Sequence, residues 1–294
     1  LDDFEIVTRI GKGGFSNVYL VQMKSNGCFY ALKQVSKSCK EEDVTAVEES
    51  LLEERNIMSS LEGNHVVKLH FAFQTDEFCY FVLDFLPCGD MLSQMSEEVC
   101  LREDQAKICA AQLILALQEL HSKKIIYRDL KPENVLIDLD GSLKLCDFGL
   151  SKRISNDNAP IDSICGTFHF MSPEMLRKKG YDCRTDYFSL GTLLFELVTG
   201  TLPFEASDTK SLARKIAFKN PKYPPFLSPE LIDFLSKLLM KNPDERLGSK
   251  GGAEEILNHC WFKGLDLEKL KNKKLPAIWS HVPLTQSLRW PSRS

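Results

Sequence analysis

The sequence predicts an α+β fold with two lobes: a small lobe built on an antiparallel β-sheet with one helix, and a larger, mainly helical lobe. Two observations carry this prediction. Up to residue 85, short apolar segments with strand-like alternation are separated by turn residues. From residue 104 onward, most apolar residues recur with the spacing of helices. The predicted boundaries are 4–83 for the small lobe, 84–89 for the hinge and 90–262 for the large lobe.

Five strands and one helix are predicted in the small lobe. The strands cover Phe4–Ile10, Asn17–Met23, Cys28–Gln34, His65–Phe73 and Phe78–Phe85. Asn26-Gly27 is a strong hairpin signal and separates the second strand from the third. The segment Glu41–Leu61 is predicted to be a helix, because its apolar residues recur at spacings of three, four and seven.

The large lobe is predicted to hold four helices and two short strands. The helices cover Asp104–His121, Ser189–Thr199, Thr209–Phe218 and Pro229–Met240, and the strands Val135–Ile137 and Leu143–Leu145. Ser228 is the expected N-cap of the last helix, since its hydroxyl can accept a hydrogen bond from a free backbone N–H. The polar segment Ser155–Pro160 is the best candidate for a mobile loop.

Composition excludes several classes of protein. The 294 residues are 43% hydrophobic and 27% charged, which is typical of a globular protein. The net charge of −4 argues against a nucleic-acid partner, because dedicated nucleic-acid binders are usually basic. No apolar run approaches the ~20 residues that span a bilayer, so no membrane span is expected. Because the chain begins at Leu1 rather than Met, we expect it to be a fragment.

The cysteines and histidines give no sign of a metal site. The ten cysteines form no Cys-x-x-Cys pair, and no His lies at zinc-ligand spacing from one. We expect reduced, mostly buried thiols in a cytoplasmic or nuclear protein. The six histidines are dispersed along the chain and are expected to be structural.

The most informative residues lie between positions 127 and 149. Asp129 is followed by Lys131 and Asn134, and a second acid, Asp147, comes further along the chain. Phosphoryl transfer needs such groups: an acid to orient a hydroxyl, a cation for the phosphate and oxygen ligands for Mg²⁺. A chance loop would explain any one of these residues, but it is a poor explanation for the whole set in this order.

The segment Tyr127-Arg128-Asp129-Leu130-Lys131-Pro132-Glu133-Asn134, followed by Asp147-Phe148-Gly149, resembles the catalytic loop and the DFG motif of protein kinases. The resemblance covers about residues 4 to 262 and is closest to the AGC group. It implies ATP and Mg²⁺ as cofactors, with Asp129 as the catalytic base. By the same resemblance Lys131 neutralises the transferring phosphate, and Asn134 and Asp147 bind the metal. Lys131 followed by Pro-Glu-Asn is similar to Ser/Thr kinases rather than tyrosine kinases.

A glycine-rich segment in the small lobe resembles the kinase loop that covers the nucleotide phosphates. It is not a Walker A motif, because neither Gly-Lys-Ser/Thr nor a helix follows. Ser16 stands where the third glycine is usual. The residues expected to contact nucleotide here are Ile10, Gly11, Lys12, Gly13, Gly14, Phe15, Ser16, Asn17 and Val18.

Lys33 ends the next strand, where the resemblance implies a lysine that binds the α- and β-phosphates. Its acidic partner is expected to be Glu54, with the neighbouring Glu53 as the alternative. The other residues implied for nucleotide binding are Ala31, Leu83 (the gatekeeper position), Asp84, Leu86, Asp90 and Leu136. Asp90 is implied to meet the ribose or a basic substrate residue.

The segment from Asp147 to Glu174 resembles an AGC activation loop that ends in Ser172-Pro173-Glu174. Ser163 matches the activating phosphosite, and a phosphate there could pair with Arg128 and Lys152. Thr167 resembles the threonine that hydrogen-bonds the catalytic Asp and Lys.

Several positions depart from the family pattern, and others match its structural residues. Phe168-His169 replaces Pro-Glu, so the resemblance does not predict the substrate preference of the groove. Ser50 replaces a His, so it does not predict how phosphorylation of Ser163 is coupled to the position of the small-lobe helix. Asp186 resembles a buried acid that anchors the catalytic loop. Arg246 resembles the partner of Glu174 in a buried ion pair.

The resemblance implies protein substrates, an upstream activating kinase and a monomer. Glu133 and Asp90 are expected to favour basic residues near the acceptor. Residues 263–294 resemble only the first part of the AGC C-terminal tail, because no Phe follows Phe262. A pseudokinase or scaffold that binds nucleotide without turnover is the alternative, although Lys33 and Asp129 are both present.

Overall fold

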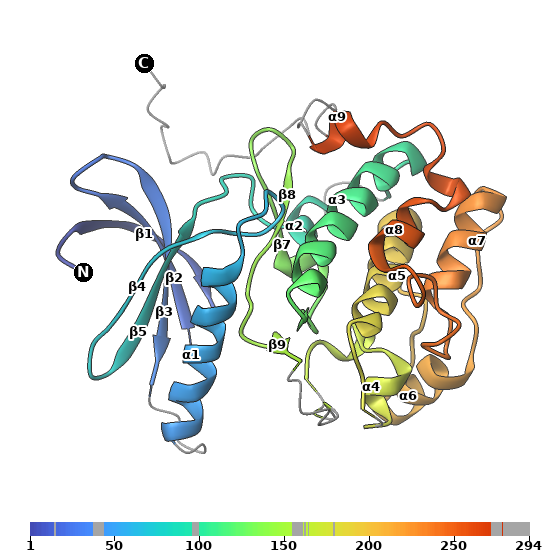
Figure 1. Ribbon diagram of the computed structural model, residues 1–294, viewed down its shortest axis with the longest axis horizontal. Coiled ribbons are helices and arrows are strands. Elements are labelled where there is room, and N and C mark those ends of the chain that lie inside the picture. The colour runs from blue at the N-terminus through green and yellow to red at the C-terminus, as the bar shows by residue number, and fades with distance from the viewer. Residues whose placement is uncertain are drawn as a thin grey trace. The chain divides into compact units, whose positions relative to one another are not determined.

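The computed structural model describes residues 1–14, 16–37, 44–95, 100–154, 161, 163, 165–178, 180–271 and 278. The chain forms two compact units, Leu1–Leu86 and Pro87–Ser294 (Figure 1). The first contains a five-stranded sheet and the second is mainly helical, so the predicted α+β, two-lobed fold class is confirmed. No helix in these ranges is both long and apolar enough to cross a membrane.

The sheet of the first unit is antiparallel throughout, in the order β1-β2-β3-β5-β4. Its strands are β1 (Phe4–Lys12), β2 (Ser16–Met23), β3 (Phe29–Ser36), β4 (Leu69–Gln74) and β5 (Phe78–Asp84). Leu20 and Val21 point to opposite faces of β2, and both are fully buried, so both faces of the sheet are covered at its centre. Val21 packs in a cluster with Leu32, Tyr80 and Val82.

Every small-lobe element differs from its predicted bounds by at least one residue, and two differences matter most. The helix α1 spans Val44–Ser60, and residues 41–43 of the predicted helix lie outside the described residues. The fourth strand begins at Leu69 rather than His65. Val66 and Val67 lie before the β4–β5 ladder. Both are buried, so their apolar side chains pack in the core and do not indicate strand pairing.

The second unit is built around two long helices, α3 (Glu103–Ser122) and α5 (Arg184–Thr199). These two helices contact each other (Figure 1). In addition, α8 (Gly252–Leu257) contacts α3, and α7 (Pro229–Leu238) contacts α5. The remaining helices are α2 (Met91–Met95), α4 (Pro173–Leu176), α6 (Thr209–Phe218) and α9 (Leu267–Lys271). Short 3₁₀ turns cover Pro132–Asn134, Phe168–Phe170 and Cys260–Phe262.

Two short antiparallel ladders complete this unit. β6 (Ile125–Ile126) pairs with β9 (Lys152–Arg153), and β7 (Val135–Ile137) pairs with β8 (Leu143–Leu145). The predicted bounds of α6, β7 and β8 are confirmed. The predicted cap is also confirmed, because the Ser228 hydroxyl accepts a hydrogen bond from Leu231 N at 3.2 Å.

The helix α5 begins at Arg184, five residues before the predicted start. Its first turn contains Arg184, Thr185 and Asp186, which break the apolar periodicity. The periodicity therefore did not predict that the helix begins at Arg184. Gly191 in this helix allows α7 to approach closely, since a Cβ there would lie 2.9 Å from Leu238 Cβ.

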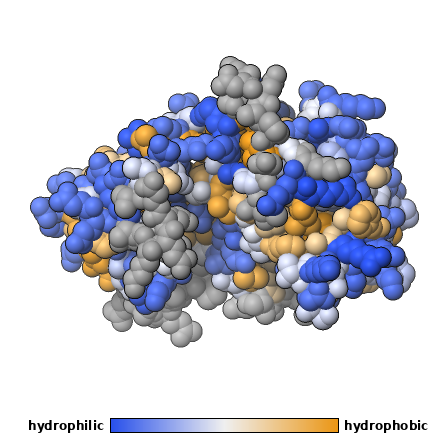
Figure 2. Space-filling model, turned by 90° about the horizontal axis from the view of Figure 1, so that it is seen from below, coloured by the Kyte–Doolittle hydropathy of each residue, from blue (hydrophilic) through white to orange (hydrophobic). Residues whose placement is uncertain are grey.

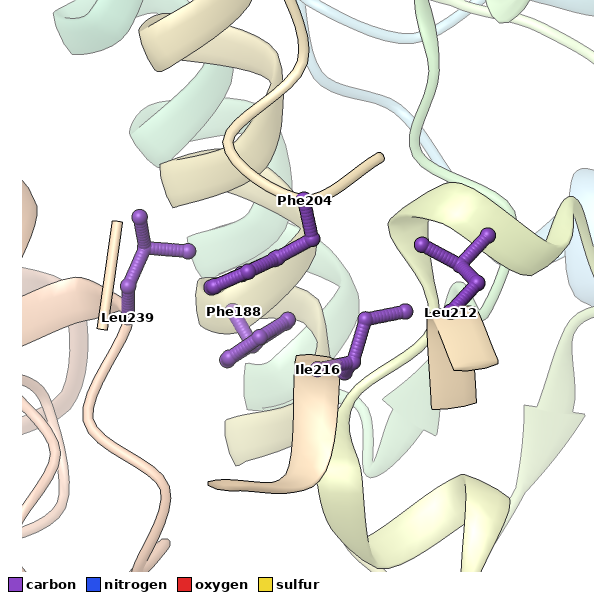
Figure 3. Close-up of a cluster of buried hydrophobic side chains, with 5 residues drawn as sticks. All are labelled: Phe188, Phe204, Leu212, Ile216 and Leu239. Carbon is purple, nitrogen blue, oxygen red and sulfur yellow. The ribbon is translucent and has the colours of Figure 1, made fainter. Parts of the chain in front are cut away.

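A second apolar cluster joins α5 to α6 and consists of Phe188, Phe204, Leu212, Ile216 and Leu239 (Figure 3). The rings of Phe188 and Phe204 stack with an interplanar angle of 9°. The Lys241 ammonium lies 3.9 Å from the centroid of the Phe204 ring. Burial lowers the pKa of Lys241 to about 7, and the aromatic ring opposes this by stabilising the cation.

The cysteines are less buried than expected. All nine described cysteines are free, but of these only Cys88 and Cys109 are buried. Cys28, Cys100 and Cys260 are exposed, because they lie in turns and element ends rather than on core faces. The prediction of mostly buried thiols was therefore wrong.

Candidate active site

The loop that carries Asp129 is held by the carboxylate of Asp186, at the start of α5. Asp186 is fully buried. Its Oδ2 accepts a hydrogen bond from Tyr127 N and its Oδ1 from Arg128 N, both at 2.9 Å. His121 Nε2 lies 2.8 Å from Oδ2. A buried carboxylate with three N–H partners is satisfied and can hold the loop backbone in one conformation.

Arg128 needs that support because its backbone has a φ of 70°. A non-glycine residue in this region costs roughly 1–3 kcal/mol and persists only where its surroundings impose it. The left-handed turn separates two neighbouring side chains. The guanidinium of Arg128 reaches Leu150 O and Ser163, whereas Asp129 contacts Thr167.

Asp129 is buried among four hydrogen-bonding groups. Its Oδ2 lies 2.8 Å from both Asn134 Nδ2 and Lys131 Nζ. Its Oδ1 accepts from Thr167 N at 3.0 Å and lies 3.3 Å from Thr167 Oγ1. Lys131 Nζ also donates to Thr167 Oγ1 at 2.8 Å. The four residues named from the sequence at this point, Asp129, Lys131, Asn134 and Thr167, are therefore brought together.

The segment that carries Thr167 can approach this loop because residue 166 is glycine. Gly166 has a φ of 94°, and a Cβ at this position would lie 2.6 Å from Arg128 O. A side chain here would strain the backbone and push the two segments apart. The position therefore admits only glycine if Thr167 is to reach Asp129.

Asn134 and Asp147 have the donor chemistry of a Mg²⁺ site. The amide nitrogen of Asn134 donates to Asp129 O at 2.9 Å, which leaves the amide oxygen as the group able to bind a cation. Asp147 is exposed and adopts a φ of 53°, and its neighbour Cys146 donates its N–H to Asn134 O at 3.0 Å. One carboxylate and one amide oxygen fit Mg²⁺, which keeps several waters and substrate oxygens in its shell.

The other cluster of potential metal ligands in the described residues is not a metal site. It consists of Asp233, His259 and Cys260. Both ring nitrogens of His259 are engaged, since Nε2 lies 2.9 Å from Asp233 Oδ2 and Nδ1 accepts from Trp261 N. The structural role expected for this histidine fits these contacts.

In the first unit, Lys33 Nζ lies 2.8 Å from Glu54 Oε1, and both side chains are largely buried. The expected pairing with Glu54 is thus present. The glycine-rich segment forms the β1–β2 hairpin, in which Gly13 N donates to Ser16 O at 2.7 Å. Phe15 lies outside the described residues. Ala31 and Leu83 are partners in the β3–β5 ladder.

The two acids of the predicted nucleotide-binding set have local partners. Asp84 Oδ1 lies 2.8 Å from His70 Nε2. Asp90 accepts from Ser93 N at 2.9 Å, which caps the start of α2, and its backbone bridges to Leu136. Leu86, which lies between these two acids in the chain, is buried.

Ser163 lies in a small network of hydroxyl and guanidinium groups. Arg128 Nη1 donates to Ser163 Oγ at 3.0 Å and to Tyr181 Oη at 3.1 Å. The Tyr181 hydroxyl donates to Ser163 O at 2.9 Å. Lys152, the other predicted partner, lies in β9 with an exposed side chain, and its pairing with a phosphate stays a prediction. Tyr181 was not found from the sequence, because no spacing pattern relates it to Ser163.

Two acids in the second unit, Glu133 and Glu196, lie close enough to interact electrostatically, and neither forms an ion pair with a described residue. Burial raises the pKa of Glu196 to about 6, and the nearby Glu133 adds to the shift. Glu196 Oε2 is buried and has no hydrogen-bond partner in the described residues. Glu196 was not predicted from the sequence, although a single acid within the apolar run of α5 was a usable signal.

The segment after Thr167 is fixed by the ion pair expected between Glu174 and Arg246. Arg246 Nη1 and Nη2 bind the two carboxylate oxygens at 2.6 and 2.9 Å, and both side chains are buried. Arg246 also donates to Met240 O and Arg184 O. These added hydrogen bonds offset the cost of burying the charges.

A family profile and several known proteins match most of this chain. Residues 4–262 match the family profile described as "Protein kinase domain". The chain is 41% identical over 276 residues to the serine/threonine-protein kinase AtPK1/AtPK6 of Arabidopsis thaliana, covering 94% of this chain and 58% of that protein. It is 40% identical over 277 residues to the ribosomal protein S6 kinase alpha-1 of Rattus norvegicus, covering 92% and 37%. The chain therefore spans about a third to three fifths of the length of these relatives.

Replacing the buried anchor should destabilise the protein. In Asp186→Asn, one backbone N–H of the loop loses its acceptor and the charge that faces His121 is removed. We expect the free energy of unfolding, measured by chemical denaturation, to fall by about 3–5 kcal/mol. Asp244→Asn is the matched control, because Asp244 is exposed and pairs only at the surface with Arg184; its effect should stay below about 1 kcal/mol. Equal effects of the two substitutions would contradict the anchoring role.

Proposed function

Because this chain belongs to the protein kinase family, in the AGC group, we propose that it is an ATP-dependent Ser/Thr protein kinase. It transfers the γ-phosphoryl group of ATP to a hydroxyl of a protein substrate. The observation that carries the proposal is the set of contacts around Asp129, in which Lys131, Asn134 and Thr167 all hydrogen-bond to one carboxylate or to each other.

In this proposal Asp129 orients the substrate hydroxyl and accepts its proton late in the transfer. Its carboxylate suits that task because its position is fixed from two sides, by Asn134 and by Thr167. Lys131 lies 2.8 Å from Asp129 and supplies the cation that stabilises charge on the transferring phosphoryl group. Mg²⁺, when bound, supplies further charge neutralisation, and Asn134 and Asp147 would hold it.

Residues of the first unit are proposed to bind the nucleotide. The backbone N–H groups of the β1–β2 hairpin suit the phosphate oxygens, because glycines leave them accessible. Lys33 is proposed to bind the α- and β-phosphates, and its contact with Glu54 fixes the direction of the long side chain.

The proposed catalytic role of Asp129 is tested by Asp129→Asn. The variant should keep its ability to bind ATP, while kcat for a peptide substrate falls by about 10²–10⁴-fold, since the amide cannot accept the proton. Asp76→Asn, in an exposed turn of the first unit, should leave kcat unchanged. If the wild-type protein transferred no phosphate even when Ser163 is phosphorylated, the scaffold alternative would replace this proposal.

A preference for basic residues near the acceptor follows from the acids of the second unit. Glu196 is partly buried, its Oε2 has no hydrogen-bond partner in the described residues, and Glu133 lies close enough to raise its pKa. An arginine of the substrate would relieve both the repulsion and the unsatisfied oxygen. Asp90 contributes less, because its carboxylate already caps α2.

This preference predicts a dependence on pH. Because the pKa of Glu196 is raised to about 6, its carboxyl is charged at pH 7 and becomes neutral as the pH falls to 5. The KM of an Arg-containing peptide should therefore rise over this range, with a smaller change in kcat. In Glu196→Gln the KM should be about tenfold higher at pH 7 and nearly independent of pH. A variant with the wild-type pH profile would remove Glu196 from substrate recognition.

Phosphorylation of Ser163 is proposed to activate the enzyme. A phosphate there adds about −1.5 to −2 charges beside Arg128, whose Nη1 already lies 3.0 Å from the hydroxyl. Arg128 precedes Asp129 in the chain, so ordering its side chain supports the loop that holds the catalytic carboxylate. Tyr181 can donate a further hydrogen bond to the phosphate, and Lys152 is the other proposed partner.

The activation step is tested by comparing phosphorylated and phosphatase-treated protein, with the occupancy of Ser163 measured by mass spectrometry. The wild-type kcat should fall by about 5- to 150-fold on treatment, the range of ordinary allosteric coupling. Ser163→Ala should show the low rate before and after treatment, whereas the control Ser236→Ala should respond like the wild type. A high rate in Ser163→Ala would contradict the switch.

The remaining partners and the location form part of the same proposal. We propose a monomer that acts on protein substrates and is phosphorylated by an upstream kinase, in the cytoplasm or nucleus. The nine cysteines that the structure describes are all free, which supports a reducing compartment. The net charge of −4 supports the absence of a nucleic-acid partner.

A further inference from the structure

The outer face of α6 carries an open pocket that the proposed phosphoryl transfer does not use. On the inner face of α6, Leu212 and Ile216 pack into the cluster of Figure 3. The pocket lies elsewhere on the helix and is lined by Ser211, Arg214, Lys215, Phe218 and Lys219. Phe218 is 71% exposed, the highest value among the large hydrophobic side chains of the described residues.

The segment around this pocket is strongly basic. Between Thr209 and Lys222 the chain has five basic residues and no acidic one, although the whole protein has a net charge of −4. The five are Lys210, Arg214, Lys215, Lys219 and Lys222. None of them pairs with a carboxylate of the described residues. The nearest acids in sequence are Glu205, whose carbonyl accepts from Lys215 Nζ, and Asp208, whose carboxylate caps α6 at Ser211 N.

Phe218 is held in place although it is exposed. The guanidinium carbon of Arg177 lies 5.2 Å from the centroid of its ring, and Arg177 Nη2 donates to Ala217 O at 3.1 Å. The arginine therefore fixes the end of α6 and one face of the ring at the same time. α6 lies at the lower edge of Figure 1, on the side from which Figure 2 is seen, and there an apolar area borders hydrophilic side chains in the right-hand part of the molecule.

We propose that this pocket on α6 binds an acidic peptide segment of a protein partner, with one aromatic or aliphatic residue seated on Phe218. Cations that have no carboxylate partner select carboxylates, and the exposed ring offers an apolar anchor beside them. A membrane surface fits less well, because one exposed aromatic residue provides little apolar area for insertion. An extended nucleic acid fits less well because the protein as a whole is acidic.

Binding at this pocket would be independent of ATP and of the residues around Asp129. For a substrate that carries such a segment, it would raise the local concentration of the acceptor and so lower KM without changing kcat. That consequence rests on the proposed kinase activity, whereas peptide binding itself does not. A binding assay without nucleotide therefore separates the two proposals.

The test is fluorescence anisotropy with a fluorescein-labelled peptide of ten residues, nine Asp or Glu residues around one central Phe. The whole chain should bind this peptide saturably, and binding should weaken as salt is raised, since the charges are exposed. Phe218→Ser and Lys219→Glu should each weaken binding by about tenfold. The matched controls are Phe226→Ser, another exposed aromatic residue, and Lys250→Glu, another exposed lysine, both outside the pocket; they should bind like the wild type.

Circular dichroism and phosphorylation of a short peptide without the acidic segment should show that the variants remain folded and active. The proposal is overturned if the acidic peptide does not bind the wild-type chain, or if the pocket variants bind it as well as the controls do. It is equally overturned if phosphatidylserine vesicles bind through Phe218 and Lys219 while the peptide does not.

Discussion

The hydrogen bonds from the backbone of Tyr127 and Arg128 to Asp186 are the constraint on which the rest of the second unit's site depends. They hold a left-handed residue in a loop that has little regular structure of its own. A charged acceptor can impose such a conformation because a buried carboxylate without these partners would be very costly. The same turn sends Arg128 toward Ser163 and leaves Asp129 beside Thr167, so regulation and chemistry start from adjacent residues.

A second set of contacts fixes the segment opposite this loop. Gly166 allows close approach, Thr167 binds both Asp129 and Lys131, and Glu174 is held by Arg246. Each contact joins residues far apart in sequence, so the segment is placed by the folded second unit rather than by its own local preferences. This explains how a change at Ser163, between these fixed points and Arg128, could act on the position of the catalytic carboxylate.

The sequence predicted the features that depend on local spacing. The strands of the small lobe, the helix α6 and the Ser228 cap follow from periodicity and turn residues. Asp129, Lys131 and Asn134 were also found, because one short loop contains all three. Tyr181 and Glu196 were missed, since the importance of Tyr181 comes from its contact with Ser163 and that of Glu196 from its partial burial near Glu133, and no spacing pattern encodes either. The exposure of Cys28 and Cys260 was misjudged because a hydrophobic residue type does not reveal whether its position lies in a turn.

The most direct test of the central claim, that Asp186 holds the loop, is the hydrogen-exchange rate of the Tyr127 and Arg128 amides in the wild-type protein. If the two N–H groups are bound to the buried carboxylate as the distances of 2.9 Å indicate, they should exchange as slowly as the buried amides of α5. Exchange as fast as that of the exposed turn at Leu139 and Asp140 would show that the loop opens locally, and would contradict the account.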